Sequence, residues 1–387
     1  PEKEFTNAEI KGKKHYKKAK KRLEEWFERF FAEGFSEWNS TAYIPIDLMG
    51  FFALYELADD PKLKKLAKKA LDMTFELIAY NSHHGLMGCS HGRSYEKELK
   101  GRYINHTNAL IRVSWGVGYL NEATTAQALY CLSDYRPEPE LKKYIDWKES
   151  NGMIFENTQG KNNFVDLYLY KNKDYLLTAA VDFKAAKKGY QEHINQLTID
   201  AETLFWVNHP GENLKIGFGR PSYWAGNGYL PKVAQYKNIQ FLLFDIGKEH
   251  PVNFTHAYFP TYVFDEYIKK DNYYFVRKDK AFFAVTAANS LNLVKDGINQ
   301  GRELKSIGRK NSWLIRAANE NEFKSFENFI NQISNSYLNI NAGEIEFNDP
   351  GHGKFRFNWK DYLFLNDNLI EIEHTAPTGK LTIDKKI

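Results

Sequence analysis

The stretch from His91 to Arg102, HGRSYEKELKGR, contains many side chains that can bind anions or move protons. It combines a His, a Tyr, two Arg and two Lys with two Gly, a composition that predicts a non-helical, cationic, hydrogen-bonding loop rather than core. A tyrosine close to a cation loses its proton more easily. Tyr95, two residues after Arg93, is therefore a candidate acid–base group.

Two other segments carry complementary groups. Ser36-Glu37-Trp38-Asn39-Ser40 places the amide of Asn39 beside an aromatic ring at a helix entry, and Gly189-Tyr190-Gln191-Glu192-His193 places His193 at the start of a predicted strand. We predict that Asn39, Tyr95 and His193 converge on one anionic sugar. Arg93, His91 and Arg102 are expected to bind its charged groups.

These residue types suit β-elimination from a uronate. The reaction breaks the glycosidic bond at C4 by removing the C5 proton, which is far too weakly acidic until the neighbouring carboxylate is neutralised. The amide of Asn39 can hydrogen-bond that carboxylate and stabilise the enolate-like intermediate. Tyr95 can act as the base or protonate the leaving oxygen, and His193 can serve as a second base or orient the substrate.

Composition limits the class of protein. The chain has 387 residues, enough for two domains, with 43% hydrophobic and 26% charged residues, as in ordinary globular proteins. A net charge of +4 is too small to predict a nucleic-acid partner, and no apolar run is long enough to predict a membrane span. Cys89 and Cys131 are expected to be free thiols, and no metal or cofactor is expected. The printed sequence shows no signal-peptide pattern; we expect a secreted or periplasmic location.

The first part of the chain has helical periodicity. Apolar residues from Leu23 to Phe31 recur at i, i+3, i+4, i+7 and i+8, which predicts an amphipathic helix over residues 16–33 that Gly34 closes. Further helices are predicted from Ser40 or Thr41 to Ala58, from Pro61 through Ile78, and over residues 105–120, 123–134 and 138–147. Short loops make these helices antiparallel pairs, as in an α/α toroid. Six helices would form only part of such a ring, so the ring is an open arc or further helices precede Pro1.

From residue 148 the pattern changes to short apolar runs separated by turn residues, which predicts an antiparallel β-sandwich. Predicted strands include residues 164–170, 175–181, 196–206 and 238–245, and one helix is predicted over 322–334. The predicted class is therefore α+β with two domains: a toroid-like helical domain over residues 1–147 and a β-sandwich domain over residues 148–387.

This organisation and three local motifs resemble the heparinase II/III-like polysaccharide lyases, which join an α/α toroid to antiparallel β-sheets. The motifs are Asn39 in SEWNS, Tyr95 at 95 − 39 = 56 positions further on, and GYQEHINQLTID with His193. The later segment RPSYW, with Tyr223 and Trp224, is similar to an Arg- and aromatic-rich segment of that family. The resemblance implies lyase activity on an acidic, uronate-containing polysaccharide such as a glycosaminoglycan.

The chain departs from the family pattern where a metal would bind. Family members often carry a second His two positions after the first, and this position is Asn195 here. The Asp that precedes a Gly in the next turn of the family is replaced by Asn208-His209-Pro210-Gly211. No family-type zinc site is therefore expected.

Each candidate residue also has a structural explanation. Asn39 could cap the second helix, Tyr95 could be an ordinary half-buried tyrosine, and His193 could be a structural histidine. Tyr223 and Trp224 could be a sugar platform or plain core. Asn105 and His106 form an alternative amide and base pair, with His106 also a candidate substrate contact.

Two other classes of function remain open. A carbohydrate-binding protein could keep this fold without turnover. A glycoside hydrolase on a similar toroid would need two carboxylates that flank the bond. Glu37, Asp47, Glu96 and Glu98 are available for that role. A lyase product absorbs ultraviolet light because it contains an unsaturated uronate, and this property separates a lyase from the other two classes.

Overall fold

The computed structural model describes residues 3–5 and 10–384, with helices in the first third and strands after it. The N-terminal helices are α1 (Gly12–Glu33), α2 (Ile44–Leu57), α3 (Pro61–Tyr80), the single turn α4 (Glu96–Leu99), α5 (Asn108–Trp115), α6 (Gln127–Leu132) and α7 (Lys142–Ile145). Short 3-10 turns lie at Arg102–Ile104 and Pro139–Leu141, and two small ribbons pair β1 (Glu4–Phe5) with β2 (Ile10–Lys11) and β3 (Ser82–His83) with β4 (Leu86–Met87).

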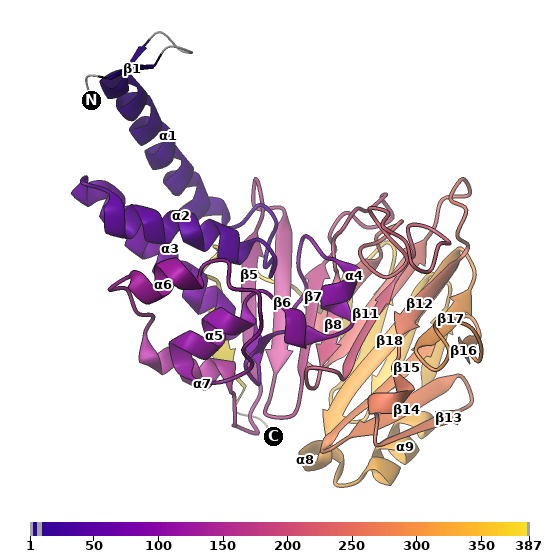
Figure 1. Cartoon of the computed structure of the whole chain (residues 1–387). Helices are drawn as coiled ribbons and strands as arrows, with labels where there is room; N and C mark the ends of the chain where they lie inside the picture. The colour runs from indigo at the N-terminus through magenta and orange to yellow at the C-terminus, as the bar shows by residue number, and fades with distance from the viewer. Residues whose placement is uncertain (1–2, 6–9, 385–387) are drawn as a thin grey trace.

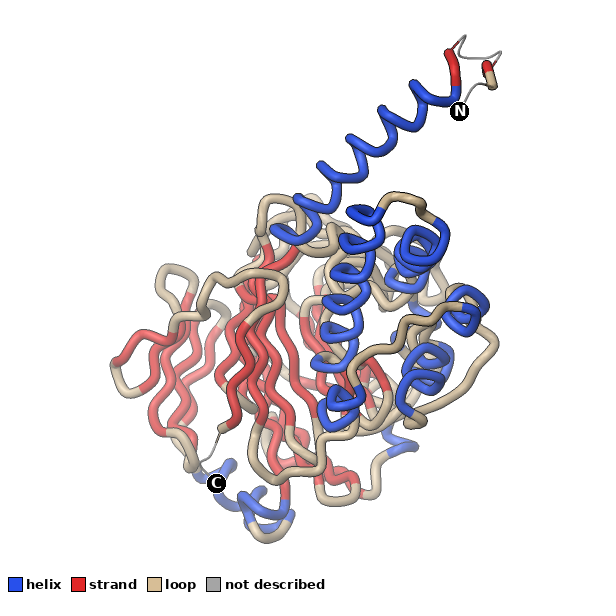
Figure 2. Tube along the Cα trace, turned by 90° about the vertical axis from the view of Figure 1, so that its left-hand side faces the viewer, coloured by secondary structure: helices blue, strands red, loops and turns tan. Residues whose placement is uncertain are grey.

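The long helices begin and end at residues whose local chemistry explains the boundary. Gly34 follows α1 with φ +69°, and its N–H donates to the Phe30 carbonyl. Asp60 caps α3, because its Oδ1 accepts from the amides of Lys62 and Leu63 at 2.9 and 3.4 Å. Only the C-terminal part of α1 packs on the body, whereas its N-terminal half projects beyond the other helices (Figures 1 and 2).

A nine-stranded antiparallel sheet lies against the helical layer, in the order β16-β17-β12-β9-β8-β7-β6-β5-β24. Its strands are β5 (Met153–Gln159), β6 (Val165–Lys171), β7 (Leu176–Val181), β8 (Asn195–Thr198), β9 (Leu204–Asn208), β12 (Phe254–Tyr258), β16 (Leu291–Leu293), β17 (Glu303–Ile307) and β24 (Lys380–Ile383).

Two further antiparallel sheets complete the structure. The six-stranded sheet has the order β10 (Lys232–Tyr236), β11 (Ile239–Asp245), β18 (Lys310–Asn319), β15 (Ala281–Ala287), β14 (Tyr273–Lys278) and β13 (Glu266–Lys270). The five-stranded sheet runs from β19 (Leu338–Asn341) through β20 (Glu344–Asp349), β21 (Gly353–Asn358) and β22 (Leu363–Leu365) to β23 (Asn368–Ile370). Helices α8 (Glu320–Phe323) and α9 (Phe326–Asn335) precede it, and a 3-10 turn lies at Thr261–Val263.

Three of the hydrophobic cores formed by the described residues hold these layers together. Leu176 belongs to the core shared with the helices, and its neighbour Leu177 belongs to the core between the two large sheets. Successive strand residues point to opposite faces, so one strand serves both cores. A third core joins the six-stranded sheet to α9 and the five-stranded sheet, through residues such as Phe241, Phe329 and Phe347. The nine-stranded sheet is therefore covered on both faces.

The predicted α+β class, with helices followed by antiparallel sheets, is confirmed. Several local predictions were wrong. The helices predicted over residues 105–120 and 123–134 are shortened to α5 and α6, and the helix predicted over 322–334 is divided between α8 and α9. The stretch from His91 to Arg102, predicted to be non-helical, contains the helical turn α4. Residues 196–206 were expected to form one strand, but β8 and β9 are separated by a turn in which Asp200 Oδ1 accepts from the amides of Glu202 and Thr203. The second helix starts at Ile44 rather than at Ser40 or Thr41, because residues 36–43 form turns and the Ile44 amide donates to the Ser40 carbonyl.

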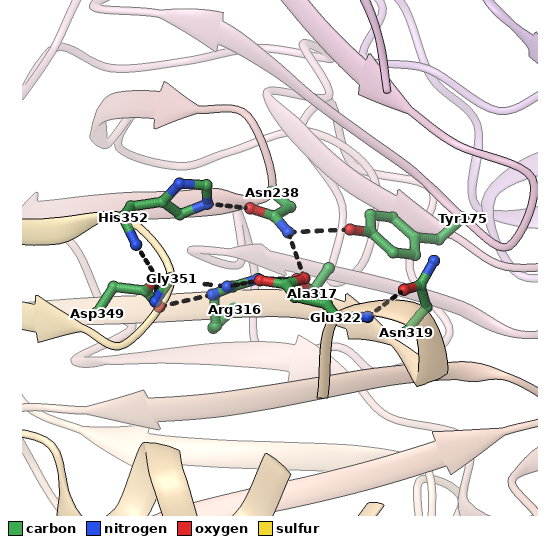
Figure 3. A network of polar contacts seen from close by, with 9 residues as sticks. All are labelled: Tyr175, Asn238, Arg316, Ala317, Asn319, Glu322, Asp349, Gly351 and His352. Carbon is green, nitrogen blue, oxygen red and sulfur yellow. Dashed lines mark hydrogen bonds and ion pairs between the residues drawn. The ribbon is translucent and has the colours of Figure 1, made fainter. Parts of the chain in front are cut away.

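A buried ionic network joins all three large sheets (Figure 3). Arg316 on β18 donates to Asp349 at the end of β20, with Nε and Oδ2 at 2.7 Å, and also pairs with Glu322. Asn238 bridges Glu322 to the hydroxyl of Tyr175, which precedes β7. The network therefore fixes the relative position of the sheets through charged and polar contacts, in addition to the cores.

Within residues 3–5 and 10–384, no helix is long and apolar enough to cross a membrane.

Candidate functional site

Backbone hydrogen bonds attach the segment from His91 to Ser94 to the residues that precede β8 of the nine-stranded sheet. His91 and His193 exchange two backbone hydrogen bonds, at 3.0 and 2.8 Å, and the Ser94 amide donates to the Gln191 carbonyl at 2.9 Å. The GYQEH segment, residues 189–193, thus lies directly beside the stretch from His91 to Arg102, which we call the cationic segment. This contact joins residues on the two sides of residue 148.

Gly92 allows the same segment to approach the turn before α2. Its amide donates to the Trp38 carbonyl at 2.7 Å, and a Cβ at this position would lie 3.0 Å from the indole Nε1 of Trp38. A larger residue would push the segment away from the turn. The glycine therefore brings Arg93 within reach of Glu37 and Tyr43.

Arg93 is the centre of a polar cluster. Its Nε and Nη2 contact Glu37 Oε1 at 2.7 and 2.6 Å, and its guanidinium lies over the ring of Tyr43, 5.0 Å from the centroid. Its Nη1 donates to the hydroxyls of Tyr43 and Tyr95, at 3.4 and 3.5 Å. The two phenolic oxygens are themselves 3.3 Å apart. One guanidinium therefore holds both hydroxyls side by side.

The two tyrosines of this cluster differ in acidity. Burial alone would raise the pKa of Tyr95, but hydrogen bonds from Tyr43 and Arg93 and the charges of Arg93 and Arg220 outweigh it, so the pKa of Tyr95 is lowered. The hydrogen bond to Tyr95, followed by burial, raises the pKa of Tyr43. The cluster thus favours a phenolate at Tyr95 and a protonated hydroxyl at Tyr43.

Tyr95 lines a cavity of about 490 Å³, which we call the cationic pocket. Lys97, Lys100 and Arg220 supply three positive charges in its wall against the one negative charge of Glu96. Lys100 pairs with Glu96 and lies 5.2 Å from the ring centroid of Trp224. The remaining cations have no such partner in the wall, so the pocket suits an anionic ligand.

Gln191 and Phe218 are among the pocket residues that the prediction from sequence missed. Gln191 is 4% exposed and lines the pocket, and its Oε1 has no hydrogen-bond partner among the described residues. Such an oxygen is suited to accept from a sugar hydroxyl. Phe218, between Gly217 and Gly219, is 95% exposed at the pocket, where its ring can stack on a sugar. The GYQEH motif contained Gln191, but only the structure shows which of its side chains faces the cavity.

A second cavity, of about 470 Å³, lies on the side of Tyr43, and we call it the acidic pocket. Tyr43 lines it, whereas Tyr95 lines the cationic pocket, so the contact between these two hydroxyls lies between the two cavities. Its charged side chains are Glu33, Glu37, Asp47, Arg29 and Lys161, and Trp26 adds an aromatic face. Burial, with a smaller effect of Glu37, raises the pKa of Asp47 to about 6.

No protein-family model matches this sequence, and no curated protein matches it either.

Asn39, the predicted carboxylate-binding amide, lies behind the polar cluster rather than in either cavity wall. It is 1% exposed and has φ +52°. Its Nδ2 donates to Asn81 Oδ1 and the Ser90 carbonyl at 3.3 and 3.4 Å, and its Oδ1 accepts from Gln159 at 2.9 Å. The side chain does not cap α2, which was the structural alternative. It ties the turn before α2 to the cationic segment and to β5.

We expect Asn39→Gly to cost about 1–3 kcal/mol of stability, because Gln159 loses its buried acceptor while glycine still permits the positive φ. Turnover of the folded variant should fall by less than about 10²-fold, the smallest loss expected for an oxyanion donor. Urea unfolding and initial rates measure the two effects. If turnover of the folded variant instead fell about 10²–10³-fold, Asn39 would bind the substrate carboxylate, as the sequence predicted.

His193, His91 and Arg102 form a buried layer beneath the cationic segment. His193 is 2% exposed and contacts Gln196 Oε1 through Nε2 at 2.6 Å, and burial lowers its pKa well below the ordinary value. His91 and Arg102 are both 0% exposed, so the prediction that these ends of the stretch lie outside the core was wrong. Both ends turn inward because acceptors are present there: the Cys89 backbone carbonyl for His91 and the Gln196 Oε1 for Arg102.

The other predicted contacts also have internal partners. Tyr223 is 1% exposed and donates to Glu303 at 2.7 Å, and Trp224 is 0% exposed and stacks on His256, which matches the core alternative. His106 is half-buried beside Glu98, with 3.6 Å between Nε2 and Oε1. Its neighbour Asn105 is buried and bonds Met87 and Thr107.

Cys89 and Cys131 are free thiols, as predicted. In the described part of the chain, no group of three or more His, Cys, Asp or Glu side chains could hold a metal ion.

Proposed function

We propose that this protein is a polysaccharide lyase that cleaves an acidic, uronate-containing glycan by β-elimination, with Tyr95 as the base. The observation that carries the proposal is the Tyr95 hydroxyl, held by Arg93 and Tyr43 at the edge of the cationic pocket. A phenol with a lowered pKa beside an anion-binding cavity meets the two needs of the reaction: a base, and positive charge for the carboxylate.

In this proposal the uronate occupies the cationic pocket and the leaving sugar occupies the acidic pocket. Arg220 and Lys97 neutralise the carboxylate, which acidifies the C5 proton and stabilises the enolate that forms when the proton leaves. Gln191 Oε1 accepts from a sugar hydroxyl, and Phe218 stacks on the ring. The helical layer would be part of an α/α toroid, with the sheets closing the cleft from the other side.

The test is a panel of uronate polysaccharides read by ultraviolet absorbance. A lyase produces an unsaturated uronate that absorbs, whereas a hydrolase produces reducing ends without absorbance, and a binding protein produces neither. Parallel reducing-sugar and calorimetric binding measurements separate these outcomes. Reducing ends without absorbance on every cleaved substrate would replace the lyase proposal with the hydrolase.

One observation favours the hydrolase as second candidate. Glu37 and Asp47 both line the acidic pocket, and Asp47, with a pKa of about 6, would remain protonated as a general acid at mildly acidic pH. The Glu37 carboxylate, however, is held by Arg93 at 2.6 Å. This pairing leaves it less suited to activate a water or attack a sugar, so the lyase is the better supported function.

We expect affinity for an acidic oligosaccharide to fall as salt rises, because the binding charges are exposed at the cavity wall. Arg220→Gln should weaken binding about tenfold at low salt, the loss of one charge-assisted hydrogen bond. Arg277→Gln, which removes a half-exposed guanidinium on β14, outside the cationic pocket, is the control and should leave affinity unchanged. Equal effects of both substitutions would show that net charge alone, rather than the cationic pocket, attracts the ligand.

A further inference from the structure

The contact between Tyr43 and Tyr95 places two proton-carrying groups side by side between the two cavities. Their oxygens are 3.3 Å apart, and both lie within hydrogen-bonding distance of the same nitrogen, Arg93 Nη1. Tyr95 faces the cationic pocket and Tyr43 the acidic pocket. Because the two oxygens are so close, a glycan bound across the pair would meet both hydroxyls from the same side.

Their environments give the two groups different tasks. The pKa of Tyr95 is lowered by the hydrogen bonds from Tyr43 and Arg93, which outweigh burial, whereas the pKa of Tyr43 is raised. Neighbouring titratable groups whose acidities are pushed apart are suited to act as an acid and base pair. The charges that face the pair are those of Arg93, Glu37 and Arg220.

Resting on the lyase function proposed above, we propose that Tyr43 is the acid of the elimination and Tyr95 its base, and that both act on the same face of the uronate. The Tyr95 phenolate takes the C5 proton. The electron pair of that C–H bond forms the C4–C5 double bond as the C4–O4 bond breaks, and O4 takes the proton of the Tyr43 hydroxyl. Proton transfer from Tyr95 to the Tyr43 phenolate, across their hydrogen bond, restores both groups without water or cofactor.

This geometry selects a stereochemical class of substrate. In D-glucuronate and D-mannuronate the C5 proton and O4 lie on the same face of the ring. In their C5 epimers, L-iduronate and L-guluronate, the two lie on opposite faces. The buried His193, at 2% exposure, does not offer a second base across the cleft. The substrate class is therefore glycans that contain D-glucuronate or D-mannuronate. The identity of the sugar that precedes the uronate does not enter this selection.

Two pairs of polymers that differ at C5 test the selection. Chondroitin contains D-glucuronate where dermatan contains L-iduronate, and polymannuronate and polyguluronate are related in the same way. We expect the D-uronate member of whichever pair is cleaved to react at least about 10²-fold faster than the L-uronate member. On the L-uronate polymer the acid and base would be misplaced, and positioned acid–base groups contribute at least this factor. Equal rates on both members would overturn the same-face geometry while leaving the lyase function intact, and no ultraviolet product from any polymer would overturn both.

The role of Tyr43 is tested by Tyr43→Phe, which keeps the ring beneath Arg93. We expect kcat to fall about 10²-fold with little change in KM, the lower end of acid–base effects, because water can protonate the leaving oxygen in its place. A synthetic glucuronide with a nitrophenoxy group at C4 needs no proton on its leaving group. Tyr43→Phe should therefore cleave it at nearly the wild-type rate, and Tyr95→Phe should not. Wild-type kcat of Tyr43→Phe on the polymer, or no rescue by the nitrophenoxy group, would remove Tyr43 as the acid.

A measurement without substrate provides an independent check. In protein labelled with carbon-13 at the phenolic carbon, the Tyr95 resonance is the one lost in Tyr95→Phe. Tyr43→Phe should raise the pH at which this resonance titrates by about one unit, because the phenolate loses a hydrogen-bond donor. An unchanged titration would show that the two hydroxyls do not share a proton. Tyr337→Phe, on the distant five-stranded sheet side of the molecule, controls for labelling and folding.

Discussion

Tyr95→Phe is expected to reduce turnover about 10²–10⁴-fold while the protein stays folded. Phenylalanine keeps the ring and removes only a hydroxyl that is bonded to Tyr43 and Arg93 at 3.3 and 3.5 Å. The stability change should be at most about 0.5–1.5 kcal/mol, the net value of one hydrogen bond. Ultraviolet product formation on the best polymer of the panel measures turnover, and urea unfolding measures stability.

The matched control is Tyr337→Phe, whose hydroxyl also makes one long hydrogen bond, to Glu346 at 3.4 Å, far from the cleft. It should retain wild-type turnover. A folded Tyr95→Phe protein that keeps more than about a tenth of the wild-type rate would remove Tyr95 from the mechanism, because that loss is smaller than acid–base catalysis supplies. The hydrolase arrangement in the acidic pocket would then be examined first, through Asp47→Asn.

The pH profile adds a signature that a structural role of Tyr95 would lack. A base must be deprotonated, so kcat/KM should rise as pH approaches the lowered pKa of Tyr95 from below and level off above it. Arg93→Gln should move this limb to higher pH, because the phenolate loses a hydrogen-bond donor and a nearby positive charge. Arg220→Gln should move it in the same direction by less, because Arg220 acts only through its charge.

Sequence patterns predicted which segments form this site better than they predicted what each residue does there. The residue types, together with the resemblance to the lyases, predicted that the segments around Asn39, Tyr95 and His193 converge. The contacts of Arg93, Ser90 and His91 place these segments side by side. Periodicity could not show which side chains face the cavity. That choice depends on backbone pairing between residues 91–94 and 191–193, a contact about a hundred positions apart in the chain.

The same limit applies to the pocket wall and to the fold. Phe218 and Arg220 lie in a long connection between β9 and β10, where no periodic pattern marks an inward or outward side. The helices with clear stripes and caps, such as α1 and α3, were predicted within a few residues because local chemistry sets their ends. The order of strands in the sheets depends on pairings between distant segments, which alternation of apolar residues does not encode.

Arg316→Met is expected to destabilise the protein by about 3–5 kcal/mol, the cost of removing one partner from a buried ion pair. Arg316 and Asp349 are 1% and 2% exposed, and Glu322 completes the pair on the other side of the guanidinium (Figure 3). Methionine retains much of the side-chain volume, so the loss comes chiefly from two carboxylates left without their cation. Arg277→Met is the matched control, because its pairs with Asp265 and Glu266 are half-exposed and should contribute at most about 1 kcal/mol.

The dependence of this loss on pH identifies its cause. In the wild type, burial raises the pKa of Asp349, but Arg316 outweighs this effect and the pKa is lowered. The stability that this carboxylate contributes is therefore present above its ordinary pKa and is lost as pH falls through the lowered value. Without Arg316, the largest effect that lowers the pKa of Asp349 is lost, and burial raises this pKa. The carboxylate should then take up a proton at mildly acidic pH. The difference in stability between Arg316→Met and wild type should thus be larger at pH 8 than at pH 4.

His352 contributes to wild-type stability over a separate pH range. Burial, with a smaller effect of Arg316, lowers its pKa to about 4. The unfolded chain takes up this proton near the ordinary pKa of 6.5, so wild-type stability should fall as pH drops from there toward 4. His352→Gln should flatten this part of the profile.

A double variant separates loss of charge pairing from loss of packing. Arg316→Met combined with Asp349→Asn removes the cation and one of its two carboxylates, so its cost at pH 8 should be well below the sum of the two single costs. Additive costs, or an Arg316→Met loss that does not change between pH 4 and pH 8, would show that the network stabilises the sheets by packing alone. Coupled costs would show that charge complementarity between β18 and β20 keeps the five-stranded sheet in place on the six-stranded sheet.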